Sequence, residues 1–208
     1  PMAIAALVAL VLTLTAAYRE PELARRIDLA HERSVCHGEP LPTTGSESCF
    51  CFMAGACAEC NCPQGCDSEV AQRHRRTATF KNLHAAVNCV NQSSVAFLSI
   101  PRKNFRNVSS LVASCGAIAE EVIQEALLEG FLAFRRVSDG AVRQCIHAPG
   151  FQSVKWMHIH TFCQDGWVDG PVDRPLMGVF WCGRMEAESQ APQLARQLLQ
   201  WEAKLRAM

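Results

Sequence analysis

Cysteine is the residue that most constrains how this chain can fold. Half of its twelve cysteines lie in one short stretch, residues 48–66, which reads SCFCFMAGACAECNCPQGC. Sulfur at this density indicates a metal site, a set of disulfides or a group of reactive thiols. The full set of candidates is Cys36, Cys49, Cys51, Cys57, Cys60, Cys62, Cys66, Cys89, Cys115, Cys145, Cys163 and Cys182.

Disulfides fit this cysteine pattern better than a metal does. The run from Cys57 to Cys66 holds enough sulfur for zinc or an iron–sulfur cluster, but its spacing matches neither paired zinc knuckles nor a ferredoxin run. Residues two apart in an extended segment point the same way, so each Cys-x-Cys pair can reach partners elsewhere. An even count favours oxidised pairs without fixing their connectivity. We therefore predict disulfides and no required cofactor, with zinc or iron–sulfur as the alternative.

Residues 1–18 form an uncharged apolar stretch that ends at Arg19 and Glu20. A retained membrane helix, a secretory signal and a buried helix of a globular domain are all consistent with its length. We expect a single membrane helix. Because the chain begins at Pro1 instead of an initiator methionine, we expect an organelle leader upstream and a thylakoid or mitochondrial inner membrane. The cysteines predict that most of the chain lies in an oxidising compartment, a lumen or intermembrane space; secretion is the alternative.

The sequence predicts a mainly α fold. Its expected parts are a membrane helix over 1–18, a short juxtamembrane helix and cysteine-rich loop over 19–66, and a mainly helical domain over 67–208. In that domain, apolar spacing predicts long helices over 68–100 and 108–134, paired as an antiparallel hairpin. Short strands are expected at 141–147, 153–163 and 177–182, followed by a helix from about Pro192.

Charge supports the predicted hairpin. Residues 70–110 contain seven lysines or arginines and no acidic residue, whereas residues 120–129 contain four glutamates. Opposite charges on neighbouring helices explain both runs without a ligand. The net charge of the whole chain is zero, and no aromatic residues alternate with the basic run 73–76, so nucleic acid is not expected as a partner.

Two histidines and a cysteine form the second candidate site. His158, His160 and Cys163 follow His147 along the chain, and His158 and His160 share one face if 153–163 is a strand. With Cys163 they could hold zinc and leave a position for hydrolytic chemistry. No glutamate completes a HExxH motif, so packed histidines are the default interpretation.

Two sequons, at Asn91 and Asn107, are interpreted as chance occurrences. Asn91 falls in a predicted helix, and Asn107 is well placed to be the N-cap of the next one. The absence of a glycine-rich phosphate loop, serine elbow or paired-carboxylate motif argues against an enzyme with a small-molecule substrate.

The leading prediction is a non-enzymatic accessory subunit that stabilises a membrane complex, with other subunits and lipid as its partners. The alternative is a secreted or surface disulfide-rich binding module. The third hypothesis is a metal-dependent enzyme that uses His158, His160 and Cys163.

Overall fold

The computed structural model describes residues 36–42, 46–58, 72–82, 87–88, 96–139, 141–163, 167–168 and 180–207. The chain divides into two compact units, Pro1–His37 and Gly38–Met208. Residues 1–18, predicted as a membrane helix, lie outside the described residues, as do the predicted boundaries at residues 18 and 66. Within the described ranges, no helix is both long and apolar enough to cross a membrane.

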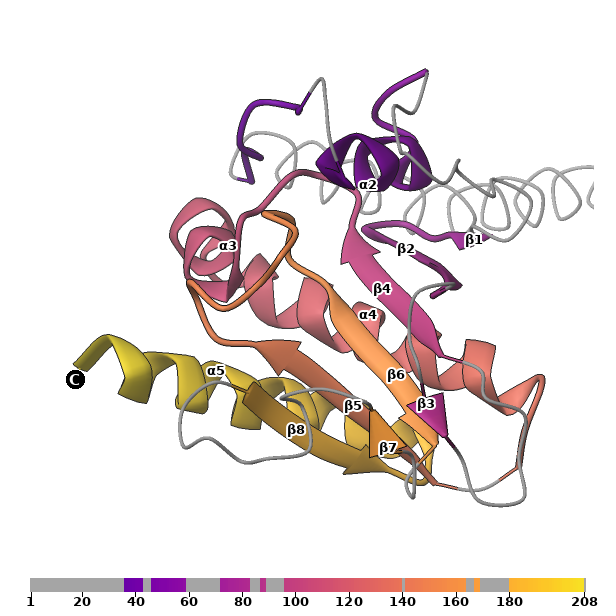
Figure 1. Cartoon of the computed structure of the whole chain (residues 1–208). Helices are drawn as coiled ribbons and strands as arrows, with labels where there is room; N and C mark the ends of the chain where they lie inside the picture. Colours follow the sequence, from indigo (N-terminus) through magenta and orange to yellow (C-terminus); the bar gives the residue numbers. More distant parts are fainter. Residues whose placement is uncertain are drawn as a thin grey trace, which may run out of the picture. The chain divides into compact units, whose positions relative to one another are not determined.

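An antiparallel sheet forms the centre of the second unit, with strand order β1-β2-β4-β6-β5-β8 (Figure 1). Its strands are β1 (Gln72–Arg73), β2 (Thr77–Lys81), β4 (Phe97–Pro101), β6 (Ile159–Cys163), β5 (Val142–His147) and β8 (Phe180–Met185). A smaller sheet pairs β3 (Val87–Asn88) with β7 (Trp167–Val168). The prediction of a mainly α fold is therefore wrong.

The helix predicted over 68–100 is also wrong, because the described parts of this segment are strands. Phe80 of β2 lies opposite Leu98 of β4, and every residue of β4 is buried. A strand that is buried on both faces has a continuous apolar run instead of an alternating one, so its period does not distinguish it from a buried helix. The predicted helical hairpin is consequently absent, and strands β2 and β4 take the place of its first helix.

The helix predicted over 108–134 is present as two helices, α3 (Val108–Cys115) and α4 (Ile118–Arg135). They are separated at Gly116, whose φ of +54° is in the region that favours glycine. The N-cap predicted at Asn107 is present: its side-chain oxygen accepts a hydrogen bond of 2.9 Å from the Ser110 backbone N–H.

The C-terminal helix α5 (Ala191–Ala207) lies where the sequence predicts it and follows a short 3-10 turn, η3 (Glu188–Gln190). Leu194 and Leu198 from the apolar stripe are buried. Helix α5 packs against α4 and against β8, the strand at one edge of the sheet. The strands expected at 141–147, 153–163 and 177–182 correspond to β5, β6 and β8, with shifted boundaries.

Helix α4 covers one face of the sheet, which we call the helix face. Gln144 of β5 points to this face, where its side-chain N–H₂ donates to the Leu127 carbonyl at 2.7 Å. A Cβ atom added at Gly130 would collide with the hydroxyl groups of Thr161 and Ser99. Glycine therefore allows α4 to approach strands β4 and β6 closely.

The opposite face, which we call the open face, is covered in part by α2 (Ser46–Ala54). The sequence predicts only a loop here, which is wrong. Phe50 and Met53 of α2 pack in a cluster with Phe80, Leu98 and Trp156, so burial against the sheet stabilises this helix. Apolar side chains on several sides of a nine-residue helix leave no clear amphipathic period in the sequence.

The two charge runs do meet, but they join a strand hairpin to a helix. His74 and Arg76, at the turn between β1 and β2, form ion pairs with α4: His74 Nε2 lies 3.3 Å from Glu129, and an Arg76 nitrogen lies 2.6 Å from Glu121. Arg73 donates from Nε to the Met53 carbonyl at 3.1 Å. The basic run therefore contributes to the packing of the domain.

Glu125 forms the most extensive of these contacts, and we expect Glu125→Ala to lower the free energy of unfolding by about 2–3 kcal/mol. One of its carboxylate oxygens accepts from the Arg76 N–H at 2.8 Å, the Thr77 N–H at 3.0 Å and the Thr77 hydroxyl at 2.9 Å. The matched control is Glu121→Ala on the same helix, which removes a half-exposed ion pair and should cost less than about 1 kcal/mol. Urea denaturation measures both, and equal losses would contradict this role of Glu125.

All eight cysteines in the described ranges are disulfide-bonded. Cys51 pairs with Cys57 at the end of α2, and Cys145 pairs with Cys182 across strands β5 and β8. The predicted disulfide chemistry is therefore confirmed for this part of the chain. Disulfides persist in oxidising surroundings, so these bonds indicate an oxidising or extracellular environment.

Candidate metal centre

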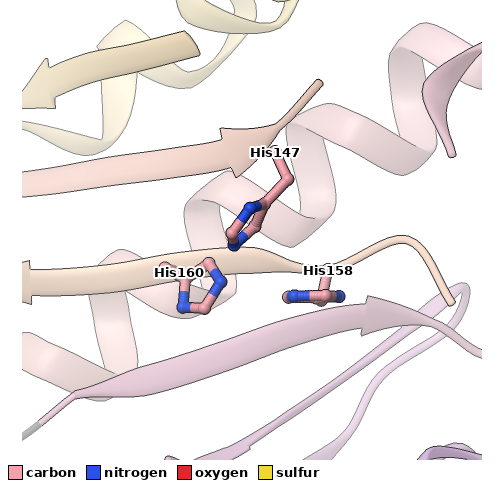
Figure 2. Close-up of side chains that lie close together, drawn as sticks. All are labelled: His147, His158 and His160. Carbon is pink, nitrogen blue, oxygen red and sulfur yellow. The ribbon is translucent and has the colours of Figure 1, made fainter. Parts of the chain in front are cut away.

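Three histidines meet on the open face because of the register of two neighbouring strands. Cys145 of β5 lies opposite His160 of β6. Side chains alternate between the two faces of a strand, so His147 lies on the same face as Cys145, and His158 lies on the same face as His160. Figure 2 shows the ring of His147, at the end of β5, directed over β6 towards the other two.

The three imidazole rings are close enough to share one ion. One ring nitrogen from each histidine lies within 4.8 Å of the others, and the centroids of the His158 and His160 rings are 4.9 Å apart. The His147 centroid lies 5.7 Å from that of His158 and 5.2 Å from that of His160. Two nitrogens on a tetrahedral zinc ion lie about 3.4 Å apart. The most distant pair of ring nitrogens would therefore come about 1.4 Å closer on binding an ion.

Burial keeps all three rings neutral near pH 7. Loss of water lowers the pKa of His158 to about 4; the Trp156 carbonyl opposes this shift, and His147 adds to it. Burial, with the neighbouring imidazoles, lowers the pKa of His160 well below its ordinary value. Burial also lowers the pKa of His147, against a backbone hydrogen bond with Phe151. Neutral imidazole is the form that binds a metal ion.

A backbone hydrogen bond fixes which nitrogen of the His158 ring carries the proton. His158 Nδ1 lies 2.7 Å from the Trp156 carbonyl, which can only accept, so Nδ1 carries the proton and Nε2 carries the lone pair. Metal-binding histidines commonly have this arrangement, in which a backbone carbonyl fixes the ring. In the described part of the chain, His147 Nδ1 and His160 Nε2 are buried without a hydrogen-bond partner.

Two apolar rings lie against the histidines. The centroid of the Phe180 ring, from β8, lies 4.5 Å from that of His147, and the centroid of the Phe50 ring, from α2, lies 5.4 Å from that of His158. Of the His, Cys, Asp and Glu side chains in the described ranges, these three histidines alone form such a group. An apolar border of this kind excludes water and strengthens the interaction of an ion with its ligands.

The structure brings His158 and His160 together, as strand alternation predicts, and adds His147. It places Cys163 elsewhere, because Cys163 lies opposite Val142, on the helix face, and is disulfide-bonded. The role of His147 depends on the register between β5 and β6. The sequence could have indicated this role, because pairing the predicted strands 141–147 and 153–163 as a hairpin brings His147 near the other two histidines.

The structure describes only part of the cysteine-rich stretch 48–66, so it tests the disulfides predicted in this stretch only there. Within it, Cys49, Cys51 and Cys57 are disulfide-bonded, whereas Cys60, Cys62 and Cys66 lie outside the described residues, as does Cys89 further along the chain. Comparisons of this chain with protein-family models, with curated proteins and with solved structures found no match. The three histidines of the open face are therefore the basis for a functional proposal.

Proposed function

We propose that this chain is a disulfide-stabilised metal-binding protein that holds one divalent transition-metal ion, zinc foremost, between His147, His158 and His160. The observation that carries the proposal is the convergence of three neutral imidazoles whose ring nitrogens lie within 4.8 Å of one another. Two buried ring nitrogens without hydrogen-bond partners in the described part of the chain support it, since such groups cost about 1–3 kcal/mol each.

The ligand set favours zinc or a similar ion. Imidazole nitrogen suits zinc and copper, whereas magnesium and calcium prefer oxygen ligands. Three protein ligands leave one position of a tetrahedral ion open, and structural zinc sites normally fill all four. The fourth position is therefore suited to an exchangeable ligand, such as water or a small anion.

This proposal is compatible with the binding module predicted from the sequence, and it does not test the predicted role in a membrane complex. A secreted or surface disulfide-rich binding module is compatible with a metal site in a disulfide-bonded domain. The role as subunit of a membrane complex depends on residues 1–18 and stays a prediction. Catalysis at the metal also stays a prediction, with His147 in place of Cys163 as the third ligand.

Equilibrium dialysis of the full chain against zinc tests the proposal, after chelator treatment with the disulfides intact. We expect one zinc ion per chain, and a loss of affinity of more than roughly a hundredfold in His160→Gln. The matched control is His37→Gln, since His37 is exposed and is not part of the cluster. Equal zinc binding by both variants would refute the proposal.

A further inference from the structure

A disulfide lies next to the three histidines, on the same face of the sheet. Cys145 pairs with Cys182 across β5 and β8, and the two Cα atoms are 4.2 Å apart. Gln144 points to the helix face, so Cys145 points to the open face. Cys145 also lies opposite His160 of β6, and it precedes His147 by two positions on its own strand. Cys145 therefore stands between its disulfide partner and His160.

The two cysteines of this disulfide differ in their exposure. Cys182, on the edge strand β8, is exposed, whereas Cys145 is only 1% exposed. Thiol–disulfide exchange begins with the attack of a thiolate on an accessible sulfur atom. An incoming thiolate therefore reaches the sulfur of Cys182 first and releases Cys145 as the leaving thiolate, on the side where the imidazoles lie.

We propose that reduction of the Cys145–Cys182 bond supplies the fourth ligand of the metal site. A dithiol reductant, such as the reduced form of a dithiol oxidoreductase, gives two electrons, is itself oxidised to a disulfide and leaves one thiol at each cysteine. Cys145 then binds the ion through sulfur as its thiol proton passes to solvent, while Cys182 remains an exposed thiol. This inference rests on the proposed metal-binding function.

The position of Cys145 makes it a suitable ligand. Residues directly opposite each other on antiparallel strands have Cβ atoms about 4.5–5.5 Å apart, and His160 is opposite Cys145. Cys182 is one strand further than Cys145 from His160, because β5 lies between β8 and β6. Cys145 is accordingly the ligand and Cys182 its partner in the oxidised state.

Reduction of the Cys145–Cys182 disulfide would change the coordination of the metal ion. With the disulfide intact, three imidazoles leave a position for an exchangeable ligand. With the disulfide reduced, the thiolate of Cys145 fills this position and gives a closed site of three nitrogens and one sulfur, the type that serves structural roles. The redox state of one disulfide would thus decide between an ion with an open coordination position and one that is fully coordinated by protein.

Single cysteine variants test this inference without a reductant that would break the other disulfides. In Cys182→Ser, Cys145 is left as a free thiol beside the histidines; in Cys145→Ser, Cys182 is left instead. Each full-length variant is loaded with Co²⁺, whose near-ultraviolet charge-transfer band reports a bound thiolate. We expect this band in Cys182→Ser, and its absence in Cys145→Ser and in the unsubstituted oxidised protein. We also expect Cys182→Ser to bind zinc more tightly than Cys145→Ser by more than roughly tenfold.

The outcomes separate this inference from the proposed function. Visible Co²⁺ bands in all three proteins without the charge-transfer band in Cys182→Ser would overturn the redox inference and leave the histidine site in place. No Co²⁺ binding by any of them would overturn both.

A second measurement uses the unsubstituted protein, in case a variant does not fold. After mild reduction, alkylation of Cys145 should be slowed by zinc, and zinc should give no such protection in His160→Gln. If alkylation of Cys145 is equally fast with and without zinc, the inference is wrong.

Discussion

The substitution His158→Gln is expected to abolish the rise in melting temperature that zinc gives to this protein. A ligand that binds only the folded state stabilises it by about 2.7 kcal/mol at a concentration of one hundred times Kd. For a domain of this size, about 1 kcal/mol corresponds to roughly 2–4 °C. Saturating zinc should therefore raise Tm by about 5–10 °C in the unsubstituted protein. Differential scanning calorimetry of chelator-treated protein, with and without zinc, measures this shift.

His158 is the most informative ligand for this experiment. It is buried and fixed by its contact with the Trp156 carbonyl, so its ring already has the orientation that a ligand needs. Glutamine retains the size and polarity of the side chain and lacks the imidazole nitrogen. The comparison uses the zinc-induced shift within each variant, so any effect of the substitution on the metal-free protein cancels. His37→Gln should keep the full shift, and a full shift in His158→Gln would count against the site.

The second large effect is a loss of stability in acid. His158 has a pKa of about 4 in the folded chain and about 6.5 when unfolded. Between these values the unfolded state binds more protons than the folded state, so stability falls as pH falls. The full stabilisation is present above about pH 6.5, and about 3 kcal/mol is lost by pH 4 through His158 alone. The lowered pKa values of His147 and His160 act in the same direction.

Urea denaturation of the metal-free protein at several pH values between 7 and 4 checks this expectation. The free energy of unfolding should decrease steadily across the window, and the decrease should be smaller by about 3 kcal/mol in His158→Gln. Replacement of the exposed His37 by glutamine should leave the slope unchanged. A slope that is identical in all three proteins would show that the buried histidines are not the source of acid sensitivity.

Local patterns predict the elements whose stability depends on local properties. The apolar stripe from Leu194 predicts the C-terminal helix, and Asn107 is recognisable as a cap. The β-rich composition after residue 137 predicts β5, β6 and β8. These features depend on helix periodicity, capping and strand propensity, which act over a few residues.

The secondary-structure predictions are wrong where tertiary contacts override the local preference of the chain for helix or loop. Residues of β2 and β4 have apolar side chains at helical spacing, yet they form strands because each strand supplies the other's hydrogen bonds and both faces are covered. Helix α2 lacks an amphipathic period, and it is stabilised by burial of Phe50 and Met53 against the sheet. The contacts between β2 and β4 join residues such as Phe80 and Leu98, and those of α2 join Phe50 to Phe80, so no local window contains them.

The sequence by itself determined that this is a disulfide-bonded chain and that His158 and His160 share a face, because alternation along one strand is a local property. Only the tertiary structure decided that His147 joins them and that Cys145 lies beside them. Both facts follow from the register of β5 against β6 and β8, which pairs Cys145 with His160 and with Cys182. Register is fixed by which side chains of each strand are buried on each face of the sheet, and a shift of one residue would place these side chains on the other face.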